Sequence, residues 1–327
     1  MVTSSKLLAP ASSTSHLRAF NARTDMGAVA DLVELCFADT LDEGGRSYLR
    51  HMRSAARTPG ALSWITSAFE WDYMPMTGYV WLQDGRLVGN ATLIPFFLTG
   101  RRCYLIANVA VHPDYRRRGI GRSLTNRAIE HARRRRSPSV WLHVRQENEA
   151  AVTLYRSLGF DERMRRTTWF GLQDYTPAVQ PPGVTFTSPL PRDWEIQRTW
   201  LHEAYPPEVS WHMPYQTNAL HPGLLGSFFR FFFSFYITQW AALRESSLLG
   251  AAAWQAMGGP ANYLWLAAPP DVDENVVHAL LVHARRHIPS QRPLTLDYPA
   301  GQFSSAIQKA GFEAQQTLIW MVLALKE

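Results

Sequence analysis

The sequence predicts an α/β fold in two tandem copies, each a mixed and mostly antiparallel sheet flanked by helices. Two observations predict the sheet: an Asp-Gly turn between the apolar runs of 79–94, and a strand at 104–111 that leads through a glycine-bearing loop into a helix. A third predicts the duplication. A helix in each half ends in a Gly-Phe pair, at Gly159 and Gly311, and their separation of 311 − 159 = 152 positions matches a domain.

Local patterns define the elements of the first half. Asp25 is expected to cap a helix, and Gly159 to end one, because glycine readily adopts the left-handed conformation that follows a helix. The apolar face of the helix after Asp25 contains Val29, Leu32, Val33, Leu35 and Cys36. Strands are expected at 17–21, 79–82, 87–94, 104–111, 139–144 and 165–172, and helices after 25, at 122–131 and at 148–158. This order predicts a mixed sheet with helices on both faces.

The second half repeats this pattern in weaker form. Residues 240–254 resemble the first hairpin, 263–270 the strand that enters the loop, and 306–312 the helix that ends in Gly-Phe. Five prolines between 174 and 191 predict an extended linker. We therefore expect a flexible leader at 1–16, a first domain at 17–173, a linker at 174–191 and a second domain at 192–327.

Composition excludes several classes of protein. With 46% apolar residues the chain can bury a sizeable core, which excludes global disorder. Cys36 and Cys103 lack CxxC spacing, which argues against a disulfide framework and for a reducing compartment. Residues 1–16 have no apolar signal-peptide run, and Arg230 interrupts the most apolar stretch, 224–243, which we expect to be buried structure or a partner-facing patch. The prediction is a cytoplasmic protein without a membrane partner.

The charge of +6 is concentrated in arginine clusters at 116–118, 133–136 and 163–166. Such clusters suit a polyanionic ligand, nucleic acid or an anionic surface, and charge alone does not choose among them. Nucleic-acid binding would be strongly salt-dependent, and no recognition motif in the sequence supports it. The cluster at 133–136 also fits a solvated helix end.

The stretch from Val109 to Gly121 is the strongest chemical signal. A strand, a loop with Gly119 and Gly121, and a helix follow one another, so unpaired N–H groups and the helix dipole point at one place, which suits a phosphate group. Pro113 and the arginines do not fit the Gly-x-Gly-x-x-Gly fingerprint, and no Gly-Lys-Ser/Thr closes a Walker loop.

The remaining pattern, Val-x-Val-x-Pro-x-x-Arg-x-x-Gly-x-Gly, resembles motif A of the GCN5-related N-acetyltransferases, the GNAT superfamily. The resemblance covers residues 17 to about 172 well and 183–327 only by pattern, which implies two tandem GNAT-like domains. It implies that loop amides hold the diphosphate of acetyl-CoA and that the main chain of 109–111 holds the pantetheine arm. The cofactor-binding residues it implies are Val109, Ala110, Val111, Arg116, Arg117, Arg118, Gly119, Ile120, Gly121, Arg122, Asn148 and Tyr155.

The segment Asn-x-x-Ala-x-x-Leu-Tyr-x-x-x-Gly-Phe at 148–160 resembles motif B of the same superfamily. By that resemblance Tyr155 is the catalytic residue that protonates the departing CoA thiolate, and Asn148 binds the cofactor arm. A tyrosine at such a place is otherwise a core residue. The matching position of the second half is Ala306 or Ile307, which has no hydroxyl.

The general base is left open. Many members of the superfamily carry a glutamate on the strand that enters the loop, where this chain offers Asn108, which cannot accept a proton. Proton removal from the amine must then use water or another side chain. The candidates are His112, Glu34, Asp39 and Glu43.

The second half lacks this chemistry. In place of the arginines and glycines it has Pro269-Pro-Asp-Val-Asp-Glu-Asn275, whose acids would repel a diphosphate and instead suit a helix start. The second domain is therefore predicted to be degenerate, with a scaffolding or acceptor-shaping role. No metal site is predicted, because Arg285 and Arg286 stand between His283 and His287 where a zinc motif would have glutamate.

The prediction is an acyl-CoA-dependent N-acyltransferase, more specifically an N-acetyltransferase. The amine would attack acetyl-CoA directly in a ternary complex, since no cysteine lies near the loop as a nucleophile. Small amines, amino acids, aminoglycoside-like compounds and protein N-termini or lysines remain open as acceptors, and Trp64, Trp71 and Tyr73 are either acceptor-pocket or core residues. The alternative is a regulatory protein that binds acyl-CoA without turnover, which Asn108 favours.

Overall fold

The computed structural model describes residues 15–40, 43–57, 77–172, 174–232, 236–257, 261–288 and 292–325. Within it the chain forms two compact units that are interleaved along the sequence. The first unit comprises 1–142, 154–160 and 322–327, and the second comprises 143–153 and 161–321. The sequence-based domains, 17–173 and 192–327 with a linker at 174–191, are each one continuous stretch of the chain. These boundaries stay a prediction. Trp64, Trp71 and Tyr73 lie outside the described residues.

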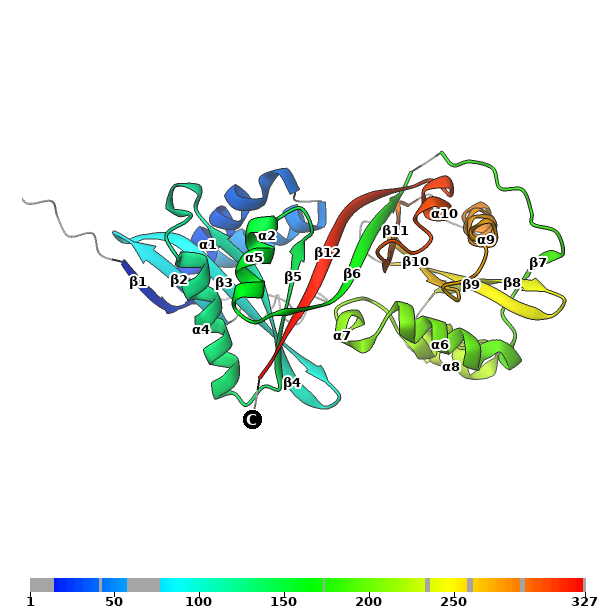
Figure 1. Ribbon diagram of the computed structural model, residues 1–327, viewed down its shortest axis with the longest axis horizontal. Helices are drawn as coiled ribbons and strands as arrows, with labels where there is room; N and C mark the ends of the chain where they lie inside the picture. The colour runs from blue at the N-terminus through cyan, green and yellow to red at the C-terminus, as the bar shows by residue number, and fades with distance from the viewer. Residues whose placement is uncertain are drawn as a thin grey trace, which may run out of the picture. The chain divides into compact units, whose positions relative to one another are not determined.

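The first unit contains a sheet with strand order β1-β2-β3-β4-β5 (Figure 1). Its strands are β1 (Ser15–Ala19), β2 (Gly78–Gln83), β3 (Arg86–Leu98), β4 (Arg101–Val111) and β5 (Ser139–Arg145), and its helices are α1 (Ala22–Phe37), α2 (Glu43–Arg57), α4 (Ile120–Arg134) and α5 (Glu149–Ser157). The pairs β1–β2, β2–β3 and β3–β4 are antiparallel, whereas β4 and β5 are parallel from Tyr104↔Val140 to Ile106↔Leu142. The predicted mixed sheet is confirmed.

The turn between β2 and β3 has the predicted form. Asp84 and Gly85 both have positive φ, 52° and 78°, as a two-residue hairpin turn with right-handed strand twist requires. Farther along β3, Gly89 lets α4 approach the sheet, because a Cβ there would lie 2.8 Å from Ile120 and 3.0 Å from Leu124. The hairpin therefore fixes the register of β3, and its glycine fixes the distance to α4.

Helix α1 begins earlier than the sequence predicts. Asn21, not Asp25, is its cap, because the Asn21 side chain accepts a hydrogen bond from Arg23 N–H at 3.0 Å. Asp25 is buried within the first turn and forms a bidentate ion pair with Arg18 of β1 at 2.6 and 2.8 Å. Leu35 was also placed wrongly on the apolar face, since it is 51% exposed. The ion pair of the Asp25 carboxylate with Arg18 thus links helix α1 to strand β1.

The second unit contains strands in the order β12-β6-β11-β10-β9-β8-β7. They are β6 (Asp161–Gly171), β7 (Val184–Thr187), β8 (Ile237–Arg244), β9 (Ser247–Gln255), β10 (Asn262–Ala267), β11 (Leu294–Pro299) and β12 (Phe312–Ala324), and its helices are α6 (Trp194–Ala204), α7 (Pro207–Ser210), α8 (Leu224–Phe232), α9 (Glu274–His287) and α10 (Ser304–Lys309). Strands β10 and β11 are parallel, and the neighbours β8–β9 and β9–β10 are antiparallel. The weak repeat seen in the sequence therefore corresponds to a second set of strands with the same mixture of parallel and antiparallel pairs.

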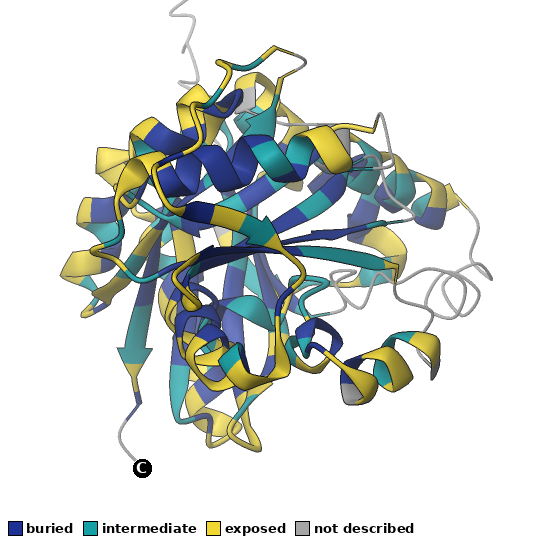
Figure 2. Ribbon diagram, turned by 90° about the vertical axis from the view of Figure 1, so that its right-hand side faces the viewer, coloured by how far each residue is buried: buried dark blue, intermediate teal, exposed yellow. Residues whose placement is uncertain are grey.

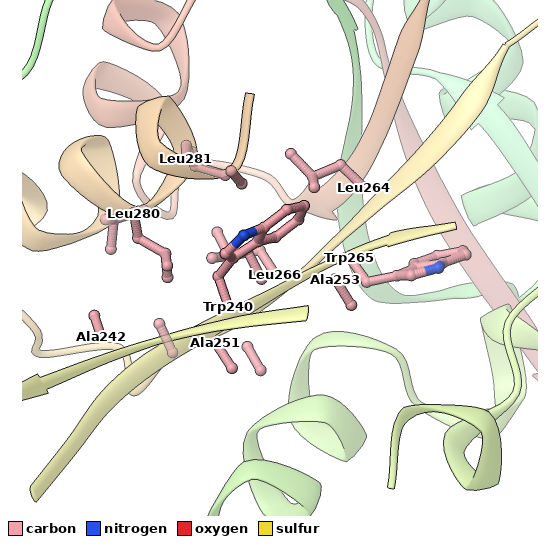
Figure 3. Close-up of a cluster of buried hydrophobic side chains, with 14 of the residues drawn as sticks. Trp240, Ala242, Ala251, Ala253, Leu264, Trp265, Leu266, Leu280 and Leu281 are labelled. Carbon is pink, nitrogen blue, oxygen red and sulfur yellow. The ribbon is translucent and has the colours of Figure 1, made fainter. Parts of the chain in front are cut away.

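The core of the second unit lies between its sheet and helix α9. Figure 3 shows Leu280 and Leu281 of α9 facing the strands that carry Trp240, Leu264 and Leu266, all of which are buried. Small residues on β8 and β9, such as Ala242 and Ala251, leave room for these larger side chains. In both units the buried residues follow the strands and the sheet-facing sides of the helices (Figure 2).

Strand β6 and the end of the chain after β12 each belong to a different unit from the sequence next to them. Strand β6 directly follows the first Gly-Phe pair, yet it pairs antiparallel with β11 from Thr295↔Phe170 to Pro299↔Arg166. Conversely, the last residues of the chain belong to the first unit, where Leu325 N–H donates to the Pro138 carbonyl at 2.8 Å. The proline-rich range 174–191 also contains β7, which pairs with β8.

The most apolar stretch, 224–243, forms α8 and β8, with 233–235 outside the described residues. Arg230 of α8 is tied to the chain through the carbonyls of Ala219 and His221, at 2.8 and 3.2 Å. Across the described ranges, no helix has the combined length and apolar character that spanning a bilayer requires.

Candidate active site

Strand β4 carries a β-bulge at the place where the sequence predicts cofactor binding. Asn90 pairs with Ala110 and Thr92 with Ala107, so two residues of β4 stand opposite one residue of β3. Asn108 within the bulge has φ of 51°, a conformation that asparagine tolerates better than most residues. Asn90 is buried and donates from Nδ2 to the Asn108 carbonyl at 3.0 Å. The bulge bends the main chain at 109–111.

The loop after β4 is closed by contacts to its own main chain. The Val111 carbonyl accepts hydrogen bonds from Arg116 Nε at 3.2 Å and from Cys36 Sγ at 3.3 Å. The expectation that no cysteine lies near the loop is therefore wrong, although burial raises the pKa of the Cys36 thiol and so disfavours the thiolate that a nucleophile would need. His112 N–H donates to Val88 O at 2.9 Å, and the ring of His112 packs edge-on against Tyr115, 5.6 Å between centroids. The loop is therefore held at both ends before α4 begins.

Helix α4 begins at a glycine cap. Gly119 has φ of 77° and supplies no side chain to the N–H groups of the first turn. A Cβ on Gly119 would meet nothing within 4 Å, so conformation and not space explains that glycine. A Cβ on Gly121 would lie 3.6 Å from Leu154 and 3.8 Å from Val111, which is ordinary contact. The protein itself therefore does not require glycine at 121.

Arginine side chains surround this helix start, and Arg116, Arg117, Arg118 and Arg122 are all exposed. Arg118 donates to the Asp114 carbonyl at 3.0 Å and lies over the Tyr115 ring, 5.1 Å from its centroid. Arg122 donates to Ser157 Oγ of α5 at 2.7 Å. Positive side chains and the positive end of the helix dipole thus coincide, and the loop can bind an anion such as a diphosphate.

The two sequence motifs meet where α4 and α5 come together. Leu154 of α5 lies beside Gly121, and Ser157 binds Arg122. Tyr155, between them in sequence, is 6% exposed and packs edge-on against Phe160, 6.0 Å between centroids. Burial raises the pKa of the Tyr155 hydroxyl to about 12. Near neutral pH the hydroxyl therefore carries its proton and can donate it.

Asn148 has a structural use in α5. Its Oδ1 accepts a hydrogen bond from Ala151 N–H at 3.1 Å, which is the geometry of a helix cap, and the residue is exposed. Asn148 belongs to the second unit and Tyr155 to the first. Contact of Asn148 with a cofactor arm stays a prediction.

The candidate general bases differ in whether their side chains already form hydrogen bonds or ion pairs. His112 Nδ1 accepts from Asp114 N–H at 3.3 Å, and its Nε2 lies 3.1 Å from Arg86, so both ring nitrogens have partners. Glu34 pairs with Arg53 of α2. Asp39 lies in a 3₁₀ turn from Ala38 to Thr40 and is exposed. The side chain of Glu43 lies outside what the structure describes.

One contact at the bulge has no counterpart among the sequence-based predictions. The Asn108 side chain forms a hydrogen bond with the Tyr48 hydroxyl of α2, while burial raises the pKa of Tyr48 to about 12. No local pattern links two residues 60 positions apart, so only the fold shows this pairing. A neutral pair therefore occupies the bulge of β4.

The second unit presents the counterpart of this loop with different chemistry. Helix α9 is capped by Asp273, whose carboxylate accepts from Asn275 N–H at 2.9 Å. The acids of 271–274 thus start a helix, as the sequence predicts. On the preceding strand, the Leu266 N–H donates to the Tyr205 hydroxyl at 3.1 Å. Tyr205 is 1% exposed and lies under Arg166, 5.3 Å from the ring centroid.

Arg166 belongs to a cluster that the sequence groups with ligand-binding charge. It is instead buried, 2% exposed, and paired with Asp297 of β11, and it donates to the Ala204 carbonyl. The histidines of α9 are also accounted for: His283 stacks on Phe186 at 4.5 Å, and His287 Nδ1 lies 2.8 Å from the His283 carbonyl. Over the described ranges, no three potential ligands gather around a metal position.

A mixed sheet with flanking helices occurs in both units, and in the first unit a bulged strand leads into a glycine-started helix. These features define the GNAT fold. Residues 47–160 match the family model described as "Acetyltransferase (GNAT) family". Over 96% of both chains the structure is similar to a GCN5-related N-acetyltransferase from Sphaerobacter thermophilus, with 16% identity and a TM-score of 0.56. It is also similar to a tandem GNAT protein from the clavulanic acid biosynthesis pathway, over 96% of this chain and 99% of that one, with 17% identity and a TM-score of 0.50.

Sequence similarity is confined to a shorter region. The chain is 43% identical over 67 residues to the [ribosomal protein bS18]-alanine N-acetyltransferase of Escherichia coli strain K12. That match covers 20% of this chain and 45% of the relative. The chain thus spans less than half the length of this curated relative.

Proposed function

We propose that this chain is an acyl-CoA-dependent N-acyltransferase that moves the acetyl group of acetyl-CoA to an amine. The observation that carries the proposal is the start of α4, where Gly119 leaves the first-turn N–H groups without a side-chain cap and four exposed arginines stand around them. An anion is the ligand that this arrangement suits, and the match of 47–160 to the GNAT family model supports CoA as its source.

Each predicted site residue then has a defined part. The amides of Arg117 to Arg122, through Gly119, Ile120 and Gly121, would hold the diphosphate, with Arg116, Arg117, Arg118 and Arg122 supplying charge. The bent main chain of Val109, Ala110 and Val111 would bond the pantetheine arm and polarise the thioester carbonyl. Asn148 would add a side-chain contact to the same arm. No metal takes part in this scheme.

The reaction would be a direct acyl transfer. The neutral amine nitrogen attacks the thioester carbon, a C–N bond forms, and the C–S bond breaks. The proton on the Tyr155 hydroxyl passes to the departing sulfur, and the proton of the amine passes to water or to a nearby base. The pKa of about 12 keeps Tyr155 protonated until it is needed.

The test combines binding with turnover. Calorimetry with CoA should show one site per chain, and acetyl-CoA with a panel of amines should release free thiol faster than acetyl-CoA alone. The panel should include an N-terminal alanine peptide, because the E. coli relative carries alanine N-acetyltransferase in its name. Absence of CoA binding, or binding undiminished when Gly119 and Gly121 are both replaced by tryptophan, would refute the proposal.

A second function is favoured by Asn108. Because an asparagine held by Tyr48 stands where many GNAT enzymes have a base, the chain would bind acyl-CoA and respond to it without turnover. CoA binding with no thiol release for any amine, in a protein whose Tyr155→Phe variant behaves identically, would select this alternative.

For the second unit we propose a role without CoA. The Asp273 cap and the Tyr205 hydroxyl already satisfy N–H groups at the places equivalent to the loop and the strand of the first unit. A scaffold or a wall of the acceptor site is the role that remains. A location in the cytoplasm is likewise a proposal, based on the cysteine content of the chain.

A further inference from the structure

A run of arginines follows the end of α4 that lies away from the loop at 116–122. Helix α4 runs from that loop over 15 residues, a length of about 20 Å. Its last turn and the residues after it contain four consecutive exposed arginines, Arg133, Arg134, Arg135 and Arg136. Figure 1 shows the turn between β3 and β4 at the same end of the first unit. Two segments that are distant in sequence therefore meet at this end.

The sheet places an aromatic residue and a further arginine on the side of α4. Phe97 of β3 pairs with Arg102 of β4, and Pro95 pairs with Tyr104. Tyr104 packs against His131 of α4, with 5.4 Å between ring centroids. Because alternate residues of a strand share a face, Phe97 and Arg102 lie on the face that carries α4, nearer to its C-terminal end. The arginines that follow His131 are therefore on the same side of the sheet as Phe97 and Arg102.

Acidic side chains offset little of this charge. Glu130 pairs with Arg127 at 2.8 Å and lies 3.8 Å from Arg134, whose side chain is 69% exposed. The other three arginines of 133–136 form no ion pair with any residue that the structure describes. Burial and the neighbouring arginine charges lower the pKa of His131, which lies half-buried beneath them. The surface therefore has a positive potential.

The conformation of Arg136 shows that helix stability does not account for the whole run. Arginines in the last turn of a helix interact favourably with its dipole, which accounts for Arg133 and Arg134. Arg136 lies beyond the helix with φ of 54°, a conformation that favours glycine. After two other helices the chain has Gly159 and Gly311 at this position. The arginine at 136 therefore adds charge where the backbone would favour glycine.

The exposed ring of Phe97 indicates which polyanion fits this surface. The side chain is 64% exposed, and the Arg102 guanidinium lies 5.7 Å from the ring centroid. In a single-stranded nucleic acid the bases can stack on an aromatic ring while guanidinium groups bind the phosphates. An acidic peptide would use the charge and leave the ring without a partner. A single strand therefore matches both features of the surface.

We propose that the surface formed by Phe97, Arg102 and 133–136 binds single-stranded nucleic acid. Arginines that contact phosphates and a ring that accepts any base give no sequence preference, in keeping with the lack of a recognition motif in the sequence. The strand is either RNA or DNA. This binding would be additional to the acetyl transfer proposed above and does not depend on it.

The test measures the fluorescence anisotropy of a labelled oligouridylate with the full chain. The dissociation constant should be on the order of 10⁻⁵ M, as for other binding without sequence preference. On logarithmic axes it should rise with salt concentration with a slope of about 3, because about four phosphates are neutralised. An oligothymidylate of the same length distinguishes the two sources. Tighter binding of one assigns RNA or DNA, and equal binding assigns single strands of both kinds.

Two variants remove the charge and the ring separately. Arg135→Gln combined with Arg136→Gly should weaken binding about tenfold, since two phosphate contacts are lost. The same variant should not unfold at a lower temperature, because glycine suits the backbone at 136. Phe97→Leu keeps an apolar side chain, and it should weaken binding about fivefold through loss of stacking.

The matched control is Arg117→Gln combined with Arg118→Gln. It removes the same charge from the other end of α4 and should bind the oligonucleotide like the wild type. An equal loss of binding in this control overturns the proposal, because net charge or the loop at 116–122 would then be responsible. So does wild-type affinity in a folded Arg135→Gln, Arg136→Gly protein or in the Phe97→Leu protein. Equally tight binding of a labelled polyglutamate peptide also overturns it.

Discussion

The loop between β4 and α4 and the loop between β10 and α9 occupy the same place in two copies of one fold, yet they have opposite chemistry. The first begins its helix at Gly119 without a side-chain cap, among exposed arginines. The second begins its helix with the Asp273 carboxylate on a first-turn N–H, among acids. The fold sets where helix N–H groups point, and the side chains decide whether those groups are offered to a ligand or used by the protein.

The strands before the two loops differ in the same sense. In the first unit a bulge at Asn108 bends β4. In the second unit the Tyr205 hydroxyl accepts a hydrogen bond from the N–H of Leu266 on β10. Tyr205 packs against Trp265 and Tyr298, at 5.2 and 6.3 Å between centroids. An aromatic side chain thus satisfies a main-chain group of β10. Four variants test whether these differences decide which unit binds CoA.

The largest effect is expected for Tyr155→Phe. Loss of the proton donor should lower kcat by about 10²–10⁴-fold and change KM for acetyl-CoA little. With a pKa of about 12, the Tyr155 hydroxyl is protonated at every lower pH, so this group should cause no loss of wild-type rate until the pH approaches 12. Steady-state kinetics across pH measure both. Tyr79→Phe, which removes another buried hydroxyl, is the control, and an equal loss there would contradict a specific role for Tyr155.

Reversal of charge at the first loop comes next. Arg117→Glu combined with Arg118→Glu should weaken CoA binding by about 100-fold, because two attractions to a diphosphate become repulsions. The remaining affinity should depend less on salt than that of the wild type. Calorimetry at two salt concentrations provides the measurement. Arg198→Glu, an exposed arginine on α6, should bind CoA normally, and a similar loss in that control would mean that only net charge matters.

A smaller effect is expected for Gly121→Ala. The added Cβ makes ordinary contacts with Leu154 and Val111, and alanine stabilises a helix by roughly 0.5–1 kcal/mol relative to glycine. CoA affinity should nevertheless fall about tenfold, since the methyl group would face the diphosphate. Thermal unfolding and calorimetry separate the two effects. Gly27→Ala, a helical glycine with its nearest contact at 3.7 Å, should leave CoA binding unchanged; unaltered CoA affinity in Gly121→Ala would place the anion elsewhere.

The smallest effect on activity is expected for Tyr205→Phe. Removal of the hydroxyl leaves the buried N–H of Leu266 without its partner, which should lower the free energy of unfolding by about 1–3 kcal/mol. CoA should still bind at one site per chain, with unchanged kcat, because the loop of the second unit remains acidic. Denaturant unfolding and calorimetry are the measurements. A second CoA site in this variant would show that Tyr205 alone had kept the second unit from binding.

Local features of the fold could be predicted because each has a local cause. The Asp84-Gly85 turn, the glycines at 159 and 311 with φ of 88° and 78°, and the acidic start of α9 all follow from conformational preference or capping. The position of the glycine-started helix followed in the same way. The prediction of Asp25 as the helix cap is wrong for two reasons. Asn21, four positions earlier, is an equally good cap residue, and the Asp25 carboxylate forms an ion pair with Arg18.

Long-range features could not be predicted, because no local pattern encodes them. Nothing near Arg166 in the sequence points to Asp297, 131 positions away, and an arginine in a basic cluster is normally solvated. The same holds for Tyr48 beside Asn108 and for Tyr205 beside Leu266. For the candidate site, glycines and charge predict an anion-binding loop, which stays a prediction, whereas no local pattern identifies the base or the acceptor.

The hydrogen bond from Leu325 to Pro138 bears on how the protein is made. On a ribosome, the first half emerges long before residues 322–325, which belong to its unit. Until they arrive, the Pro138 carbonyl lacks this donor and the backbone at Gly159 lacks the Leu323 side chain, 3.5 Å from where a Cβ would be. Completion of the first unit thus requires residues 322–325, and a fragment that stops after β6 would leave a sheet edge unpaired, which favours aggregation.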